Sequence, residues 1–564
     1  MSSFYKKYAP NPRLKRDDYE FLCGEWDFAF ADGDCEPLFD KKIQVPFSYE
    51  CKASGIGDES SHECIWYKRT FNVKEHRGAV LLHFEGIDYH SFIYLNDQLV
   101  TEHVGGFTTF SIDATKYVKV GKNEIKIKVN DSFDKSQLRG KQRARGENYD
   151  CWYVQTTGIY KPVWLEYAGN SYLKNISFKT QLGGKVEAEF SLNKPAKVEF
   201  TVYEDGTRNA VYHVKLLRLS ETFTLNFVID NAKSWSAEKP NLYSVKVVVD
   251  DYDEVYSYFG FCNVTTKPDG VYINGKREFQ QMILYQGYWE DTMLSAPNDV
   301  ALEKDVQNIK AMGFNGVRVH QKVENEVFYY LCDKYGLYVW GEIPSPYEFT
   351  PKMQSEFSRD CEIIFNQLKN HVCITTWLLF NETWGVSAIK DNEEIQDYVM
   401  SEYQKIKEKD SRPIITNDGW YHLNSDVLSI HEYEQNAKVF EEEYKDKTHL
   451  VTKKIVNENR YGTAFANGFT YKNQPIMISE YGGIAIKGEG WGYGDMANDI
   501  ASFKQRLRDI VATVNSIPYL SGCCYTQYND IQQEINGLID KKGHPKLPIS
   551  LIHDIFFNAD KGRG

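Results

Sequence analysis

The first of three hydrophobic patterns along the chain is a series of short runs in which apolar and polar residues alternate. Such alternation is typical of a strand with one buried face. Turn residues, such as Asn96-Asp97, separate the runs. We therefore predict a β-sandwich of jelly-roll type over residues 1–168. The predicted strands are 25–30, 65–71, 79–84, 91–95, 124–129 and 163–166.

The second pattern covers residues 169–265 and again has a period of two. The clearest strands are predicted at 186–190, 196–202, 222–228 and 243–249. A unit of about one hundred residues with roughly seven strands is typical of an immunoglobulin-like β-sandwich.

The third pattern, over residues 266–564, alternates continuous apolar runs with amphipathic helices, such as 299–312, 354–370 and 496–514. Continuous apolar runs indicate strands buried on both faces, as in a parallel sheet. Eight such units predict a (β/α)8 TIM barrel. The eight runs are 282–285, 316–320, 337–340, 374–380, 413–416, 427–430, 475–479 and 520–526.

Glutamates directly follow two of these runs. Asn381-Glu382 closes the fourth run, and Ser479-Glu480 closes the seventh. In a TIM barrel the carboxyl ends of the strands form the active site, and strands four and seven face each other across it. The dipeptide Asn-Glu is uninformative by itself, because it also occurs at 123–124, 325–326, 392–393 and 457–458.

Two carboxyl groups facing one site are what glycosidic bond cleavage needs. One protonates the leaving oxygen and the other attacks the anomeric carbon, and retention of configuration needs them about 5–5.5 Å apart. The plainer interpretation of each glutamate alone is a salt bridge at the barrel rim. The pairing of strands four and seven favours catalysis.

Composition narrows the class of protein. Hydrophobic residues make up 42% and charged residues 26%, and the net charge of −13 argues against a nucleic-acid surface. No apolar run approaches a membrane span, and the first residues lack the apolar core of a signal peptide. The eleven cysteines have no zinc-type spacing. We expect a cytoplasmic protein with mostly free, buried cysteines, no metal, no cofactor and no membrane or nucleic-acid partner.

Several segments carry a family resemblance that extends over nearly the whole chain. They are 66–71, 88–96, 105–107, 156–164, 270–276, 313–318, 331–337, 369–371 with 374–382, and 478–483. Together they resemble glycoside hydrolase family 2, the β-galactosidase and β-glucuronidase family.

The resemblance implies a retaining double displacement with Glu382 as acid/base and Glu480 as nucleophile. It implies that Asn381 bonds the sugar 2-hydroxyl, that Arg318 keeps the nucleophile ionised, and that Tyr433 contacts the nucleophile. The other expected substrate-binding residues are His431, Trp420, Asp418, His320, which sits one residue nearer the arginine than in the common family pattern, and Gln527, whose amide would face the glycone.

The chain departs from the family pattern in a segment that would bind the glycone. β-Glucuronidases of the family carry an Asn-x-Lys after strand eight, and here residues 534–538 read Glu-Ile-Asn-Gly-Leu, with Leu538 at the lysine position. This favours a β-galactosidase-like enzyme. The alternative is a β-glucuronidase or β-galacturonidase in which Lys322, Arg139 or Lys141 binds the sugar carboxylate. No segment matches the metal-binding segment of the large β-galactosidases.

We therefore expect an exo-acting retaining β-glycosidase whose partner is a small glycoside or oligosaccharide. Exo action is expected from the family and from long barrel loops, such as 457–474. Two further hypotheses stay open: a carbohydrate-binding protein without catalysis, and a transglycosidase. A dimer or tetramer is only a general expectation for soluble enzymes.

Overall fold

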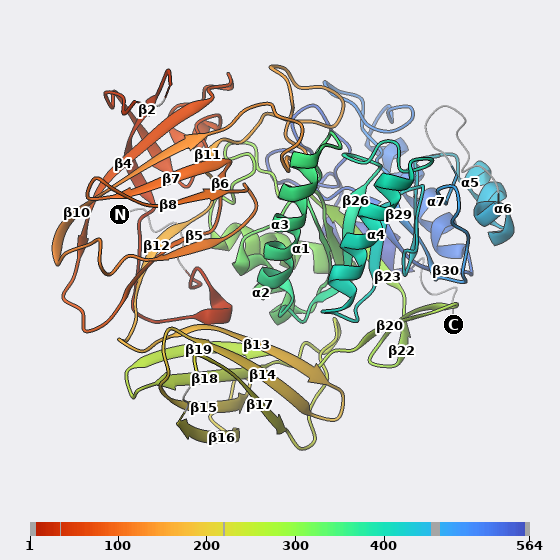
Figure 1. Cartoon of the computed structure of the whole chain (residues 1–564). Coiled ribbons are helices and arrows are strands. Elements are labelled where there is room, and N and C mark those ends of the chain that lie inside the picture. Colours follow the sequence, from red (N-terminus) through yellow and green to blue (C-terminus); the bar gives the residue numbers. More distant parts are fainter. Residues whose placement is uncertain (1–6, 34, 218–219, 453–462, 559–564) are drawn as a thin grey trace.

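The computed structural model describes residues 7–33, 35–217, 220–452 and 463–558. Three units follow one another along the chain (Figure 1): a β-sandwich drawn in red and orange, a second sandwich in yellow and green below it, and a green-to-blue barrel beside both. The predicted architecture is confirmed. The predicted loop 457–474 lies partly outside the described residues.

The first unit packs a six-stranded antiparallel sheet, in the order β3-β2-β4-β10-β7-β8, against a four-stranded sheet, β1-β12-β5-β9, with β6 and β11 as a short pair. In β10 the residues alternate in burial, so that Ile125, Ile127 and Val129 face the core. All six predicted strands occur. The strands are β1 (Tyr19–Phe21), β2 (Gly24–Phe30), β3 (Lys41–Val45), β4 (Cys64–Val73), β5 (Val80–Phe84), β6 (Ile87–Asp88), β7 (His90–Leu95), β8 (Gln98–Val104), β9 (Phe110–Asp113), β10 (Gly121–Asn130), β11 (Gly158–Ile159) and β12 (Val163–Tyr167); short 3-10 helices are η1 (Pro12–Leu14) and η2 (Lys52–Ser54).

The second unit has seven strands in two sheets, β13-β14-β17 and β16-β15-β18-β19, as its period-two pattern predicts. A three-stranded sheet, β20-β21-β22, leads into the barrel. The expected domain boundary at 265/266 falls inside β20. The strands are β13 (Leu173–Gln181), β14 (Lys185–Leu192), β15 (Lys197–Glu204), β16 (Ala210–Leu217), β17 (Thr222–Val228), β18 (Tyr243–Val249), β19 (Asp253–Phe259), β20 (Val264–Lys267), β21 (Gly270–Ile273) and β22 (Lys276–Glu278).

The barrel is an eight-stranded parallel sheet in the order β27-β26-β25-β24-β23-β30-β29-β28. A parallel bridge between Gly419 and Ile430 joins its two edges, so the sheet closes on itself. Each predicted apolar run supplies one strand. The strands are β23 (Gln280–Tyr285), β24 (Gly316–Val319), β25 (Tyr338–Glu342), β26 (Ile374–Asn381), β27 (Ile414–Asp418), β28 (Leu428–Glu432), β29 (Ile476–Gly482) and β30 (Leu520–Thr526).

Helices surround this sheet and cover its outer face (Figure 1). Side-chain caps begin several of them: Asn298 accepts from the amide of Ala301, and Thr350 accepts from that of Met353. The predicted helices at 299–312, 354–370 and 496–514 correspond to α1, α3 and α7. The helices are α1 (Asp299–Ala311), α2 (Glu326–Tyr335), α3 (Pro351–Leu368), α4 (Glu393–Lys407), α5 (Ala437–Tyr444), α6 (Lys447–Thr452), α7 (Ile500–Ser516) and α8 (Ile549–Asn558).

Buried ion pairs join the three units near the start of the chain. Arg16 forms ion pairs with Glu166 of the first sandwich, at 2.8 Å, and with Asp253 of the second, at 2.9 Å. Arg13 reaches Glu326 of the barrel at 3.0 Å. All of these side chains are at least nine-tenths buried. The segment before β1 therefore fixes the sandwiches and the barrel to one another.

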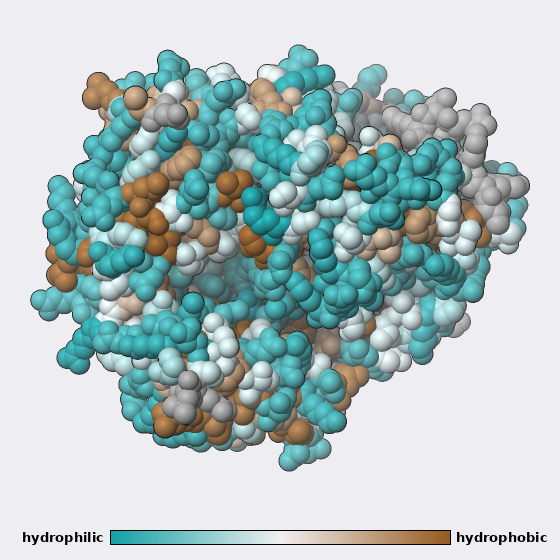
Figure 2. Space-filling model, viewed as in Figure 1, coloured by the Kyte–Doolittle hydropathy of each residue, from teal (hydrophilic) through white to brown (hydrophobic). Residues whose placement is uncertain are grey.

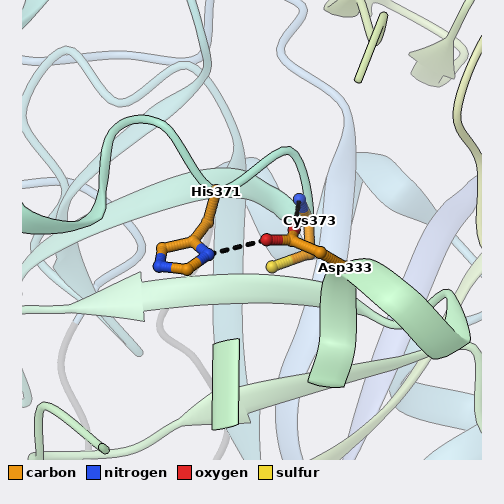
Figure 3. Close-up of side chains that lie close together, drawn as sticks. All are labelled: Asp333, His371 and Cys373. Carbon is orange, nitrogen blue, oxygen red and sulfur yellow. Dashed lines mark hydrogen bonds and ion pairs between the residues drawn. The ribbon is translucent and has the colours of Figure 1, made fainter. Parts of the chain in front are cut away.

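A second junction lies around His371, next to Asp333 and Cys373 (Figure 3). The His371 ring nitrogens lie 2.6 Å from Asp333 and 3.0 Å from Glu326, and Tyr258 of the second sandwich donates to Asp333 at 2.8 Å. Burial alone would lower the pKa of His371, but Glu326 and Asp333 raise it. Both nitrogens are engaged, so the ring offers no lone pair to a metal ion. This cluster is a structural contact between domains.

A long loop of the first sandwich, residues 131–157, reaches the carboxyl end of the barrel. The amides of Arg139 and Gly140 donate to the carbonyl of Ser345 at 3.1 and 3.2 Å. A Cβ at Gly140 would lie 2.1 Å from the carbonyl oxygen of Gln321, so only glycine allows this approach. The N-terminal domain therefore contributes to the same end of the barrel as the predicted site.

The face of the molecule shown in Figure 2 is mainly hydrophilic, and its apolar residues form small separate groups. This agrees with a chain of net charge −13. Within the part of the chain that the structure describes, no helix is long and apolar enough to cross a membrane.

We predict that Arg16→Met lowers the free energy of unfolding by about 3–5 kcal/mol, because it leaves two buried carboxylates without their cation. The measurement is the urea midpoint. Lys15→Met is the matched control, because Lys15 and its partner Asp17 are exposed, and it should change stability by less than about 1 kcal/mol. Equal midpoints for the two variants would contradict the role of Arg16.

Candidate active site

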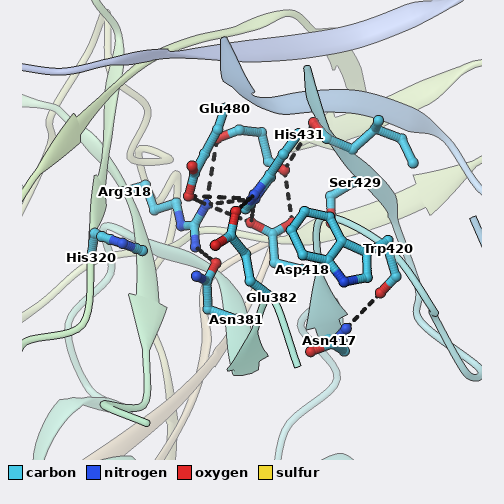
Figure 4. A network of polar contacts seen from close by, with 12 residues as sticks. Arg318, His320, Asn381, Glu382, Asn417, Asp418, Trp420, Ser429, His431 and Glu480 are labelled. Carbon is cyan, nitrogen blue, oxygen red and sulfur yellow. Dashed lines mark hydrogen bonds and ion pairs between the residues drawn. The ribbon is translucent and has the colours of Figure 1, made fainter. Parts of the chain in front are cut away.

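The carboxyl ends of the barrel strands bring polar side chains together in one network (Figure 4). Asn381 at the end of β26 is in register with Asp418 of β27, and His431 of β28 is in register with Glu480 of β29. Arg318 of β24 reaches across to both pairs. The structure therefore collects the residues that the strand-end rule predicts.

The two predicted catalytic carboxylates face each other. A carboxylate oxygen of Glu382, one of Glu480 and a ring nitrogen of His431 lie within 4.8 Å of one another. The Glu480 side chain is 5% exposed and that of Glu382 is 20% exposed. This separation is close to what a retaining pair of carboxyl groups needs.

Arg318 is the completely buried cation of the network. Its guanidinium lies 2.9 Å from Glu480, 2.5 Å from Asp418 and 2.7 Å from Glu342. Burial alone would raise the pKa of Glu480, but His431 and Arg318 hold it below its ordinary value. Glu480 is therefore ionised at neutral pH, as a nucleophile must be.

His431 links the two glutamates. Its Nδ1 lies 2.7 Å from Glu382 and its Nε2 lies 2.9 Å from Asp418. Burial alone would lower the pKa of His431, but Glu480 and Asp418 raise it to about 10. The imidazolium is thus the second cation among these carboxylates, and it is the group that contacts Glu382. The ring of Trp420 lies beside it, 5.7 Å away between centroids.

The hydroxyl of Tyr433 donates a hydrogen bond to Glu480, the contact that the sequence predicts. Its hydroxyl also lies 3.2 Å from that of Thr526 at the end of β30, and its ring stacks on Tyr493. Glu480 is therefore held from two sides, by Arg318 and by Tyr433.

Asn381 has one engaged end and one open end. Its side-chain oxygen accepts from Arg318 at 2.6 Å. Its buried Nδ2 has no hydrogen-bond partner within the described ranges. A buried unpaired donor is costly, so this nitrogen is a candidate contact for a bound hydroxyl.

Glu342 is a site residue that the sequence interpretation missed. It ends β25, pairs with Arg318, and lies 3.1 Å from Nδ1 of His320. Burial would raise the pKa of Glu342, but Arg318 and His320 lower it to about 2. Gly341 and Glu342 follow the third predicted apolar run, which ends at residue 340. The strand-end rule, applied to every strand, would therefore have found Glu342.

A hydrogen-bonded wall closes the site on the side of β30. Gln527, which was expected to face the glycone, is 1% exposed, and its amide bonds to Gln286 at 2.6 Å and Asn536 at 2.8 Å. Asn536 donates to Glu534, and Tyr153 of the N-terminal domain also donates to Glu534. Glu534 and Tyr153 were not among the predicted residues, because no strand end marks them.

The three cations proposed as carboxylate ligands differ in their surroundings. Lys322 is occupied by Glu324 at 2.6 Å and by two carbonyls, and Arg139 donates to carbonyls of its own loop. Leu538 is completely buried in the core. Lys141 has no carboxylate within 4.0 Å among the residues that are described; its ammonium lies 5.2 Å from the ring centre of Trp384.

The network around Glu382 and Glu480 does not suit a metal ion. Both His431 nitrogens already face carboxylates, and the Arg318 guanidinium occupies the space between Asp418 and Glu480. A metal cation there would be repelled by both Arg318 and the His431 imidazolium. The chemistry that this arrangement allows is proton transfer and nucleophilic attack by carboxylates.

Three family models match the chain in succession. The model described as glycosyl hydrolase 2 galactose-binding domain-like matches residues 41–161. The model described as glycosyl hydrolases family 2 matches 171–261, and the TIM barrel domain of the same family matches 293–507. Each match lies in one of the three structural units.

Curated relatives cover the chain only in part. A proposed β-glucuronidase of Formosa agariphila is 28% identical over 63% of this chain and 44% of its own length. A β-galactosidase of Thermoanaerobacterium thermosulfurigenes is 28% identical over 62% and 50%, and one of Priestia megaterium is 25% identical over 87% and 54%. The chain thus spans about half the length of these relatives.

Solved structures match this chain over nearly its whole length. A β-galacturonidase of Eisenbergiella tayi bound to galacturonate has a TM-score of 0.75 at 20% identity, covering 97% of this chain and 98% of that chain. A β-glucuronidase of Bifidobacterium dentium has a TM-score of 0.79 at 18% identity, covering 97% and 98%. At this identity the likeness concerns the fold.

We predict that His431 makes stability depend on pH in the alkaline range. Its pKa in the folded chain, about 10, lies above that of an unfolded imidazole, about 6.5. The contribution of the charged His431 to the free energy of unfolding is therefore complete below about pH 6.5 and is lost as the pH rises toward 10. The urea midpoint of wild type should fall more between pH 6.5 and 10 than that of His431→Asn. Parallel pH profiles would show that His431 is not charged in the folded chain.

Proposed function

The chain belongs to glycoside hydrolase family 2, and we propose that it hydrolyses terminal β-glycosides with retention of configuration. The observation that carries the proposal is the approach of Glu382 and Glu480 within 4.8 Å at the ends of β26 and β29. Both carboxylates are present, which argues against a binding protein that has lost catalysis.

The surroundings of the two carboxylates support different roles. Glu480 is nearly buried, holds hydrogen bonds from Arg318 and Tyr433, and has a lowered pKa, which suits the nucleophile. Glu382 is more exposed and contacts His431. A residue that exchanges protons with the leaving group and with water needs this exposure to solvent.

The reaction would proceed in two steps. An oxygen of Glu480 attacks the anomeric carbon while Glu382 gives its proton to the glycosidic oxygen, so that the aglycone leaves and a glycosyl ester forms on Glu480. Glu382 then takes a proton from water, the water oxygen attacks the anomeric carbon, and the ester bond to Glu480 breaks. The free Nδ2 of Asn381 would bind the sugar 2-hydroxyl.

We propose a neutral glycone of the galactose type as the leading substrate. The wall at β30 contains the carboxylate of Glu534, which would repel a sugar carboxylate, and Leu538 stands where β-glucuronidases of the family carry a lysine.

A uronide is the second candidate, and Lys141 favours it. Burial alone would lower the pKa of Lys141, but Cys151, Glu534, Glu480 and Glu382 raise it, so the ammonium stays charged beside the site. A buried ammonium without a carboxylate partner is suited to bind a substrate carboxylate. Several solved neighbours are named as uronidases, such as the galacturonate complex of Eisenbergiella tayi.

We predict that Glu480→Ala lowers kcat on a 4-nitrophenyl β-glycoside by at least about 10⁴-fold, because the nucleophile is lost. Glu382→Ala should retain more activity on activated leaving groups, and azide should restore part of its rate as a β-glycosyl azide. The products are followed by NMR. If azide rescues the Glu480 variant and leaves the Glu382 variant unchanged, the two roles are reversed. Transfer to a sugar acceptor in place of water would favour a transglycosidase.

A panel of 4-nitrophenyl β-galactoside, β-glucuronide, β-galacturonide, β-glucoside and β-mannoside decides the glycone. If a uronide is the substrate, Lys141→Met should lower its kcat/KM at least about tenfold relative to the galactoside, because a charged hydrogen bond is lost. Lys135→Met is the matched control in the same loop, where the lysine is half exposed and paired with Glu348. No turnover of any glycoside by wild type would reject the proposed hydrolase.

A further inference from the structure

Four aromatic side chains form a cluster at the rim of the site, here called the rim cluster. Trp152 lies 5.3 Å from Trp384 between ring centroids, Tyr347 lies 6.1 Å from Trp384, and Tyr149 stacks on Trp152 at 5.0 Å. All four side chains are half-buried. Two come from the N-terminal domain, and two follow barrel strands β25 and β26.

The rim cluster is joined to the catalytic network through Trp384. The ring of Trp384 lies 6.1 Å from that of His320, which is bonded to Glu342 on the floor of the site. Trp384 also contacts Trp152 and Tyr347. The rim cluster is therefore linked through Trp384 to a residue of the catalytic network.

The turn after β26 places Trp384 next to the proposed acid/base. Glu382 and Thr383 have left-handed backbone conformations, with φ of 48° and 64°. The amide of Glu382 donates to the carbonyl of Asp418 at 3.0 Å, and that of Thr383 donates to Asn417 at 3.0 Å. The turn is thus held by β27, and Trp384 is two residues beyond the carboxyl group that would protonate the leaving oxygen.

The N-terminal domain part of the cluster is fixed to the barrel. Tyr149 and Trp152 pair across a tight turn, and Gln533 donates to the carbonyl of Trp152 at 2.9 Å. The indole nitrogen of Trp152 donates to the hydroxyl of Tyr347 at 2.5 Å, which orients one ring against the other. Rings held in this way need little further ordering when a ligand binds.

We propose that the rim cluster is the subsite for the leaving group, and that it selects aglycones with a flat, apolar face. This inference rests on the proposed function, because Glu382 must face the leaving oxygen. Half-buried aromatic rings that are held by their neighbours, as Trp152 and Tyr347 are by the hydrogen bond between them, bind such faces by stacking. Phenolic aglycones and sugar aglycones share this chemistry.

The decisive comparison uses two leaving groups on the glycone that the panel identifies. A 4-nitrophenyl β-glycoside fills the subsite, whereas a β-glycosyl fluoride has a leaving group too small to reach it. We expect Trp152→Ala to lower the ratio of kcat/KM for the aryl glycoside over that for the fluoride at least about tenfold, because truncating a buried aromatic contact costs at least about this factor. A disaccharide of the same glycone tests the sugar alternative.

Tyr252→Ala is the matched control, because Tyr252 is 54% exposed in the turn between β18 and β19 of the second sandwich, in a different domain from the rim cluster. It should leave the ratio unchanged. Trp152→Phe should restore most of the ratio, because it keeps a flat ring while it removes the indole hydrogen bond to Tyr347.

Acceptor transfer gives a second, independent measurement. The group that leaves in the first step and the acceptor that attacks in the second step occupy the same place. With a phenyl glycoside added as acceptor, Trp152→Ala should give less transfer product relative to hydrolysis than wild type does. This ratio does not depend on how strongly the donor binds.

The outcomes separate the two proposals. If wild type turns over the fluoride and the aryl glycoside, and Trp152→Ala changes neither the kcat/KM ratio nor the transfer ratio, the subsite is wrong and the glycosidase stands. If wild type turns over no glycoside, the proposed function fails and the subsite with it. If Trp152→Ala lowers kcat/KM for the aryl glycoside but not for the disaccharide, the subsite binds phenolic aglycones.

Discussion

The ion pairs of Arg318 are the interaction on which the site depends. A guanidinium without exposure to water is stable only when carboxylates surround it, and Arg318 has Glu342, Asp418 and Glu480 within 3 Å. Each of these carboxylates in turn stays ionised because Arg318 is there. Of the two carboxyl groups proposed for catalysis, Glu382 has no contact with Arg318 within the described residues; it is joined to the network through His431. The two glutamates therefore differ in the cation that each contacts: Arg318 pairs directly with Glu480, whereas Glu382 contacts His431.

This arrangement exists only if the barrel closes. The partners of Arg318 come from β25, β27 and β29, and β27 and β28 are the two edges of the sheet that meet at Gly419 and Ile430. A shift of register between β28 and β29 would move His431 away from Glu480. The completely buried strands around the site make such a shift costly, because every residue of β26, β28 and β29 is packed. Packing of the barrel core thus sets the geometry of the charges.

Residues at strand ends were predictable from sequence, and residues on long loops were not. Glu382 and Glu480 follow continuous apolar runs, and the rule that found them also applies to Glu342. Tyr153 and Glu534 are 381 positions apart and carry no local pattern. The expected contact of Gln527 with the glycone depended on which way its amide points, and the structure directs it to Gln286 and Asn536. The contact of Tyr153 with Glu534 comes from the docking of one domain on another, and those of Gln527 come from the packing of barrel loops. Periodicity along the chain encodes neither.

The docking of the first sandwich has a consequence for how specificity is divided. The groups proposed to break the bond all belong to the barrel, whereas Lys141, Tyr149 and Trp152 belong to one loop of another domain. That loop is fixed by backbone contacts, such as those of Arg139 and Gly140 with Ser345, and by the hydrogen bond of Tyr153 to Glu534, none of which uses the side chains of residues 141, 149 and 152. Side chains at 141, 149 and 152 can therefore change while the loop stays docked and the Arg318 network stays intact. The proposed selection of substrate therefore draws on two domains, the loop of the first sandwich and the barrel residues Tyr347 and Trp384, whereas the groups proposed to break the bond belong to the barrel alone.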